Sequence, residues 1–402
     1  MRGLTGMRKA ALAALPLYIA FGAVLGFVQT ALPAILQHQG MPLAQVGLAT
    51  LLYLPFGISV IWAPLVDRYQ IARLGRRRSW IIVCQALSAT FLVIAALFPP
   101  TAALLLLAPV SFSAATMDLA LDGFLVETAR DDADRAMRGP LKVGGMLLGM
   151  VIGATLILAL HEHLGWTSSV GLLAVLTALA PIGFARGLES KQANILKRQR
   201  PRISAVLRLP GGARLIVANA FVAAAIGLGI GGFRLLLVAE GLPLSVIGFV
   251  FGVVGSVSGI LGAAVGALLG RACTARQVLL VTGLILAGCM ALPAGTGKLL
   301  TDGGLAAAIF ISISYGTYAM LFGAICSIAM KWCGEGQAAT DYALFQSSWT
   351  IAGIVGGGLA GATASGLGWT AVFLIAAICT LGASWLSATV ETTANRLAED
   401  IP

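Results

Sequence analysis

Two aspartates, Asp118 and Asp122, lie in a long apolar stretch and are the side chains best suited to carry chemistry in this chain. A spacing of four residues places both carboxylates on one face of a helix, one turn apart. If the helix spans a bilayer, Asp118 lies well inside the hydrocarbon, where a carboxylate is costly and normally faces a wet cavity or a partner. Such acids form proton relays and substrate pathways, whereas in a simpler interpretation both reach the cytoplasmic interface. Glu127, away from their shared face, is expected to pair with Arg130 or Arg135.

Two further polar residues interrupt apolar stretches and could contact a solute. Arg234 lies about one and a half turns from the outer end of its stretch. Its guanidinium could extend to the membrane interface, or it could bind a carboxylate or phenolate of an anionic ligand. Gln346 could be a polar group of a cavity, and Asp341, near the start of the same stretch, could cap the helix. The candidate residues for proton coupling and substrate contact are Asp118, Asp122, Arg234 and Gln346.

The loop after the second apolar stretch holds a cluster of opposite charges. Asp67 lies at the C-terminal end of a helix, where an isolated anion is unfavourable, so it needs cationic partners or the N-terminus of another helix. The arginines that follow could complete a latch that breaks when parts of the protein move apart. Arginines in a short loop could also serve only to set the topology. The predicted cytoplasmic gate consists of Asp67, Arg68, Arg76, Arg77 and Arg78.

Glycines recur at intervals of three and four residues in two of the apolar stretches. Such stripes of small residues let helix backbones approach closely and slide. They could form the surface on which two halves of the protein move, or they could serve only for static packing. The predicted interface residues are Gly145, Gly149, Gly153, Gly252, Gly255 and Gly259.

The composition indicates a polytopic membrane protein. Of the 402 residues, 58% are hydrophobic and only 10% are charged, and the mean hydropathy is +0.94. Soluble domains usually carry about a quarter charged residues. The net charge of +10 does not indicate nucleic-acid binding, because the basic residues lie in short loops between apolar stretches. The six cysteines show no metal-ligand spacing, so we expect no metal site, no disulfide framework and no cofactor.

Twelve stretches are long and apolar enough to span a bilayer as helices. The first of them is long enough to be a span, so no cleavable signal peptide is expected. With both termini in the cytoplasm, every Lys and Arg except Lys298 and Arg234 falls on the inner side, as the positive-inside rule requires. The predicted fold class is therefore an all-α membrane protein with twelve transmembrane helices.

Two short motifs recur half a chain length apart. Residues 40–47 (GMPLAQVG) resemble residues 241–248 (GLPLSVIG), and residues 164–166 and 367–369 both read Leu-Gly-Trp. A parallel repeat of six helices places a substrate site between the halves, near the middle of the membrane. The predicted domains are an N-terminal six-helix bundle over residues 1–186, a basic cytoplasmic linker over 187–212 and a C-terminal six-helix bundle over 213–402.

The charged loop carries a family resemblance. Asp-Arg followed by Gly-Arg-Arg-Arg, within residues 67–78, resembles the loop signature of the major facilitator superfamily. The longer pattern, over residues 62–80, is similar to the branch that holds muropeptide permeases and acetyl-CoA transporters. In that branch the fourth span carries a pair of aspartates followed by Gly or Ala, which is matched here by Asp118, Asp122 and Gly123.

Two features separate this chain from other members of that branch. Met117 replaces the Gln that usually precedes the first aspartate, and the chain stops after twelve spans. The compact form, with residues 339–346 (ATDYALFQ) opening the eleventh span, most resembles siderophore permeases of the rhizobactin and pyochelin type.

This resemblance implies a secondary transporter of the bacterial inner membrane that imports a ferric siderophore by alternating access. A permease for muropeptides or another amphiphilic, anionic solute is the alternative, as is a non-transporting receptor of the same fold. The sequence contains no nucleotide-binding Gly-Lys loop, so we expect an ion gradient, and proton symport through Asp118 or Asp122. An enzyme is not expected, because the three histidines lie outside the membrane and form no catalytic cluster. The protein is expected to be monomeric.

Overall fold

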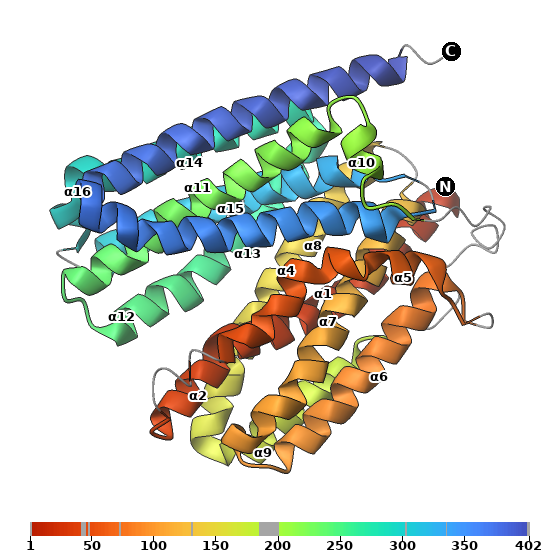
Figure 1. The fold of residues 1–402 in the computed structure, drawn as a ribbon, viewed down its shortest axis with the longest axis horizontal. Helices are drawn as coiled ribbons and strands as arrows, with labels where there is room; N and C mark the ends of the chain where they lie inside the picture. The colour runs from red at the N-terminus through yellow and green to blue at the C-terminus, as the bar shows by residue number, and fades with distance from the viewer. Residues whose placement is uncertain are drawn as a thin grey trace. The chain divides into compact units, whose positions relative to one another are not determined.

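The computed structural model describes residues 2–41, 46, 49–71, 74–129, 132–184, 201–301, 304–334 and 336–399, which are helical apart from turns and one isolated β-bridge (Figure 1). They form two compact units. Unit 1 comprises Met1–Arg130, Gly145–Ile203 and Cys333–Ala343, and unit 2 comprises Asp131–Gly144, Ser204–Trp332 and Leu344–Pro402. Two helices, α8 (Asp132–Val151) and α16 (Ala338–Glu399), contribute residues to both units.

Unit 1 is built around three long helices. Helix α7 (Pro100–Thr128) packs along α6 (Arg76–Ala96) and also contacts α1 (Arg2–Gly26). The shorter elements of this unit are η1 (Phe27–Ala31), α2 (Leu32–His38), η2 (Thr50–Tyr53), α4 (Leu54–Ile58), η3 (Ser59–Ile61), α5 (Ala63–Arg68) and η4 (Ile152–Leu156), followed by the longer α9 (Ile157–Leu179).

Unit 2 has a long central helix, α15 (Gly304–Lys331), which packs against α13 (Gly255–Ala272) and α14 (Ala275–Thr301). The remaining elements are α10 (Ala205–Arg208), α11 (Gly212–Ala239), α12 (Leu244–Gly248), η6 (Phe249–Val254) and the part of α16 from Leu344 onward (Figure 1).

The helices are consistent with the predicted twelve spans. Among the described residues, nine helical segments are long and apolar enough to cross a membrane. Two of them, Asp134–Leu179 and Ala338–Val390, contain a glycine with non-helical backbone angles, Gly165 and Gly368, so each holds two helices. A shorter apolar helix, Leu51–Ile61, lies in the predicted second span.

The second span is broken into short α- and 3-10-helical pieces, whereas the sequence predicted one continuous helix. Pro55 and Pro64 each lie at the start of one of these pieces, α4 and α5. Proline lacks a backbone N–H and cannot continue the hydrogen-bond ladder of the preceding turn. The chain therefore restarts a helix at each proline, and the last piece ends at Arg68, next to Asp67.

One glycine of each repeated motif has the same backbone conformation in both copies. Gly40 and Gly241 have φ angles of 79° and 80°, and Gly165 and Gly368 have φ angles of 75° and 81°. These angles lie in the region that disfavours residues with a Cβ atom. Each repeated glycine therefore serves as a turn in the same place of its motif, while the predicted domain boundaries stay a prediction.

The glycines of α8 and η4 pack tightly within unit 1. A Cβ atom at Gly149 or Gly153 would overlap backbone carbonyl oxygens of α1, and one at Gly145 would lie 3.0 Å from Cβ of Tyr18. Gly22 of α1 approaches the α8 backbone equally closely. Removing the side chains lets two helix backbones touch. This packing supports the static alternative for these three glycines, and their place in an interface between halves stays a prediction.

The glycines of the second stripe, Gly252, Gly255 and Gly259, are packed differently from one another. A Cβ atom at Gly255 would lie 3.2 Å from the Tyr315 ring of α15, and Gly259 is buried in the same helix as Gly255, α13. At Gly252, which lies in the π-helical turn η6, an added Cβ would meet no other atom within 4 Å. The close approach of α13 and α15 thus accounts for Gly255 but not for Gly252.

We predict that Gly153→Val destabilises the protein by about 1–3 kcal/mol, the usual cost of forcing extra atoms into a packed interior. The thermal unfolding midpoint of the purified protein in detergent measures this loss. Gly171→Val is the matched control, because a Cβ at Gly171 meets nothing within 4 Å. Equal midpoints for the two variants would show that the packing of α1 against η4 does not limit stability.

Candidate functional site

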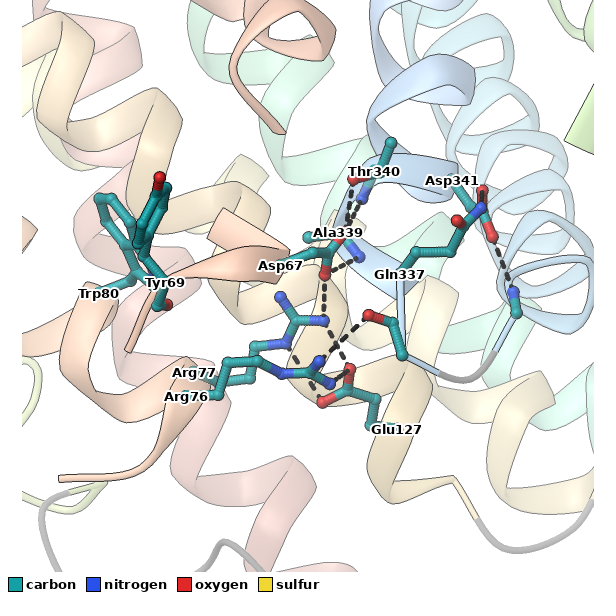
Figure 2. Close-up of polar contacts among 12 residues, drawn as sticks. Asp67, Tyr69, Arg76, Arg77, Trp80, Glu127, Gln337, Ala339, Thr340 and Asp341 are labelled. Carbon is teal, nitrogen blue, oxygen red and sulfur yellow. Dashed lines mark hydrogen bonds and ion pairs between the residues drawn. The ribbon is translucent and has the colours of Figure 1, made fainter. Parts of the chain in front are cut away.

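Arg77, in the first turn of α6, is a buried cation held between two carboxylates (Figure 2). Its Nη2 donates to Oδ1 of Asp67 at 2.6 Å and to Oε1 of Glu127 at 2.5 Å, and its Nε donates to Oε2 of Glu127 at 3.2 Å. The side chains of Arg77 and Asp67 are 1% and 0% exposed. Because charges this deeply buried are stable only when paired, the arginine ties α5, α6 and α7 together.

Asp67 has a second partner, the first turn of α16. Its Oδ1 accepts the backbone N–H of Ala339 at 3.3 Å, and its Oδ2 accepts the N–H of Thr340 at 2.7 Å and the Thr340 hydroxyl at 2.5 Å. The first N–H groups of a helix lack partners within the helix and carry partial positive charge. Residues 333–343 belong to unit 1, so Asp67 joins this helix start to the rest of the unit.

Arg76 completes the charge cluster. It forms an ion pair with Glu127, and its Nη1 donates to the carbonyl oxygen of Gly336 at 3.1 Å (Figure 2). Glu127 was expected to pair with Arg130 or Arg135, and Arg130 lies outside the described residues. Glu127 binds Arg76 and Arg77 of α6, because the long α6–α7 contact brings the end of α7 beside the start of α6.

The turn before α16 is shaped by Asp341. Its Oδ2 accepts the backbone N–H of Gly334 at 2.8 Å, and its Oδ1 accepts from Nε2 of Gln337 at 2.6 Å. Gly336 permits the turn with a φ of 91°. The role near the helix start expected for Asp341 therefore takes the form of a brace, which fixes the turn whose N–H groups bind Asp67.

Gly123 makes room for the buried guanidinium. A Cβ atom at this position would lie 2.6 Å from Cζ of Arg77 and 2.8 Å from its Nε. The arginine cannot move aside easily, because Asp67 and Glu127 hold it. The glycine of the aspartate motif thus has a steric explanation that its sequence position did not reveal.

The two remaining arginines of the predicted gate are placed differently. Arg68 is exposed, and its guanidinium carbon lies 5.5 Å from the centre of the Tyr69 ring. Arg78 is half-buried and has a partner of its own. The contacts described above therefore define a charge cluster that consists of Asp67, Arg76, Arg77 and Glu127.

Asp118 and Asp122 are both buried in α7, with 4% and 1% of their surface exposed. The hydroxyl of Tyr18, on α1, donates to Oδ1 of Asp122 at 2.8 Å. Asp118 also has a partner. Both carboxylates thus lie inside unit 1 rather than at an exposed helix end. Tyr18 could not be found from the sequence, because a tyrosine in an apolar stretch carries no signal of what it will contact.

The other two predicted residues belong to unit 2. Arg234, on α11, is exposed, and its guanidinium carbon lies 4.7 Å from the centre of the Phe251 ring. Gln346, on α16, is half-buried. The residues predicted to contact protons and solute are therefore divided between the two compact units.

We predict that Arg77→Gln destabilises the protein by about 3–5 kcal/mol, because it leaves two buried carboxylates without their shared cation. The thermal unfolding midpoint in detergent is the measurement. Arg68→Gln is the control, since it removes an exposed arginine from the same loop. If both variants unfold at the wild-type temperature, the buried cluster does not hold unit 1 together.

Solved structures match the fold over nearly the whole chain. The transporter FucP in its outward conformation has a TM-score of 0.73 at 17% sequence identity and covers 96% of this chain and 99% of its own. The human organic anion transporter TETRAN has a TM-score of 0.73 at 15% identity and covers 95% and 99%. At these identities the likeness shows the fold alone.

Curated relatives match at low identity. An uncharacterised protein of Haemophilus influenzae is 36% identical over 25% of this chain and 24% of its own length, and the putative transporter AmpG 4 of Rickettsia felis is 26% identical over 47% of each. The chain thus spans less than half the length of these two relatives. The anhydromuropeptide permease of Escherichia coli is 25% identical over 88% of this chain and 74% of its own.

The family model of the Major Facilitator Superfamily matches residues 14–329. With the helical fold described above, this match shows that the chain is a multi-pass membrane protein that belongs to the major facilitator superfamily.

Proposed function

We propose that this chain is a secondary transporter of the bacterial inner membrane that moves an anhydromuropeptide-like solute. Such a solute joins sugar rings to a peptide with free carboxylates. The observation that carries the proposal is the match to the Escherichia coli anhydromuropeptide permease, because it extends over 88% of this chain. The putative transporters of Rickettsia felis and Rickettsia conorii share the name AmpG and match shorter parts of the chain.

Import of a ferric siderophore is the narrower function that the sequence resemblance implied. None of the relatives reported above is named for a siderophore, so this function rests on the resemblance alone. The muropeptide alternative has the support of named relatives, and we therefore place it first. The distribution of Lys and Arg supports cytoplasmic termini, and we propose a monomer.

We propose that the contact between Asp67 and α16 is the gate. The segment Cys333–Ala343 continues into the rest of α16, so a movement of α16 away from unit 1 breaks the hydrogen bonds from Ala339 and Thr340. Each hydrogen bond to a charged group contributes about 1.5–3 kcal/mol. Asp67 keeps its ion pair with Arg77 throughout, so opening exposes no unpaired charge. The gate is thereby weak enough to open and to close again during transport.

We propose that Asp122 and Asp118 carry the coupling proton. Both are buried acids on one helix, and the Tyr18 hydroxyl provides Asp122 with a hydrogen bond that links α7 to α1. A carboxylate inside a membrane protein is costly while ionised and unpaired, so its charge state can be linked to a conformational change. Protonation changes what Asp122 can accept from Tyr18, which gives α1 and α7 a contact that depends on the proton.

We expect proteoliposomes that contain the purified protein to take up a labelled anhydromuropeptide and to leave a ferric siderophore outside. Flux of the siderophore alone would reverse the order of the two substrates. Binding of the anhydromuropeptide without flux would identify a receptor rather than a transporter. Liposomes without protein, and protein with Arg77→Gln, provide the background.

Uptake driven by an inward proton gradient tests the coupling residues. We predict that Asp122→Asn and Asp118→Asn each lower gradient-driven uptake at least tenfold but preserve exchange of labelled for unlabelled solute, because exchange needs no net proton movement. Glu240→Gln, an exposed acid after α11, is the control and keeps the wild-type response. Unchanged rate and pH dependence in both aspartate variants would remove the aspartates from the mechanism.

A further inference from the structure

Unit 2 contains a row of stacked aromatic side chains from two helices. On α15, the rings of Tyr318 and Phe322 lie 5.8 Å apart and are nearly parallel, at 8°. Trp349 of α16 stacks on both, with its ring 4.2 Å from that of Phe322 and 6.3 Å from that of Tyr318. Phe322 is buried, whereas Tyr318 and Trp349 are half-buried. The row is thus packed at Phe322 and partly accessible at Tyr318 and Trp349.

The row continues toward the positive charge of Arg234. The ring of Tyr315 meets that of Tyr318 edge-on at 6.1 Å and that of Phe251 edge-on at 6.3 Å. The Arg234 guanidinium lies over Phe251, and it interacts electrostatically with the Tyr315 hydroxyl. A cation held over an aromatic face keeps its N–H groups available at the edge for an anionic partner.

The depth of these residues argues against a role as membrane-interface anchors. Tyr and Trp usually anchor helices at the two membrane surfaces. Here Tyr318 lies at the middle of α15, and Trp349 lies about three turns from the start of α16. Phe251 lies in the π-helical turn η6, a local irregularity of the kind found often at functional sites.

We propose that Arg234, Phe251, Tyr315, Tyr318 and Trp349 form a solute-binding surface for a ring that bears a carboxylate. The ring lies on the accessible faces of Tyr318 and Trp349, and the carboxylate binds the guanidinium of Arg234. Sites for small molecules commonly combine apolar and aromatic faces with a few polar groups that fix orientation. This inference rests on the proposed function in that it assigns a sugar ring and a carboxylate of the proposed solute to unit 2.

Two matched probes distinguish the cationic part of this surface from its aromatic part. Phenyl glucuronide carries a ring and a carboxylate, and phenyl glucoside has the same rings without the carboxylate. Their affinities for the full-length protein in lipid nanodiscs are measured by thermophoresis. We expect Arg234→Gln to weaken the glucuronide about tenfold and to leave the glucoside unchanged, as loss of a charge-assisted hydrogen bond requires.

The aromatic part is tested on the same probes. We expect Trp349→Ala to weaken both about tenfold, while Trp349→Phe keeps most of the affinity because it retains an aromatic face. Trp385→Ala and Arg214→Gln are the controls, since both remove exposed side chains from the same helices, α16 and α11. Thermal midpoints show whether Trp349→Ala folds, and Trp349→Phe and Arg234→Gln carry the test if it does not.

Three results would overturn this surface: wild-type protein that binds neither probe, Arg234→Gln that weakens both probes equally, or Trp349→Ala that folds and weakens neither. Binding of the glucuronide at this surface by a protein that neither binds nor transports an anhydromuropeptide would overturn the proposed function and support the surface. Transport of an anhydromuropeptide with wild-type affinity by both Trp349→Ala and Arg234→Gln would overturn the surface and support the proposed function.

Discussion

Arg77 places a full positive charge in the packed interior of unit 1, at the N-terminal end of α6, where the helix dipole is also positive. Its two partners are also placed unfavourably with respect to helix dipoles. Asp67 and Glu127 are anions at the C-terminal ends of α5 and α7, where the dipole is negative. Each dipole effect is worth about 0.3–1 kcal/mol, whereas breaking a buried ion pair costs about 3–5 kcal/mol. The ion pairs therefore outweigh the unfavourable dipole terms. Three charges that would each be unfavourable alone at their helix ends are stable together.

This arrangement gives Asp67 two kinds of contact with different consequences. The contact with Arg77 lies among α5, α6 and α7, which all belong to the same continuous stretch of unit 1. The contact with Thr340 reaches a segment that returns to unit 1 from far along the chain. The contact with Arg77 compensates the charge of Asp67 and can persist. The contact with Thr340 consists of hydrogen bonds to the start of a helix, and water can replace these hydrogen bonds. In the gate that we propose, the ion pair would therefore provide stability and the hydrogen bonds to α16 would allow movement.

The sequence supported some of these features for physical reasons and could not support others. An anion at a helix end needs a partner, so the need of Asp67 for arginines or a helix N-terminus could be stated in advance, and the structure supplies both. The choice of Arg77 over Arg68 could not be stated in advance, since both arginines belong to one charged segment of the sequence and their burial depends on how α5, α6 and α7 pack. Glu127 was assigned to nearby arginines in the chain, and its actual partners lie on a helix that only tertiary packing brings near.

Glycines show the same division. Repeated turns such as Gly40 and Gly241 could be recognised, because a matching motif half a chain away exposes a shared backbone requirement. The reason for Gly123 could not, because the atom that it must avoid belongs to Arg77 on another helix. The stripe around Gly149 was visible in the sequence, but its partner, the backbone of α1, was not. The spacing of the glycines predicts that a helix packs closely against another helix. Only the three-dimensional structure identifies that other helix.

Helix α7 connects the charge cluster with the buried acids. Asp122 and Glu127 lie on this one helix, about 7.5 Å apart along its axis, and Gly123 between them leaves space for Arg77. A shift of α7 large enough to change the Tyr18–Asp122 hydrogen bond also moves Glu127 against two arginines that cannot yield freely. Coupling between sites requires a physical element with two arrangements that both sites bias. We propose that α7, which bears both groups, is such an element in unit 1, so that no chain of intermediate residues is needed to carry the effect.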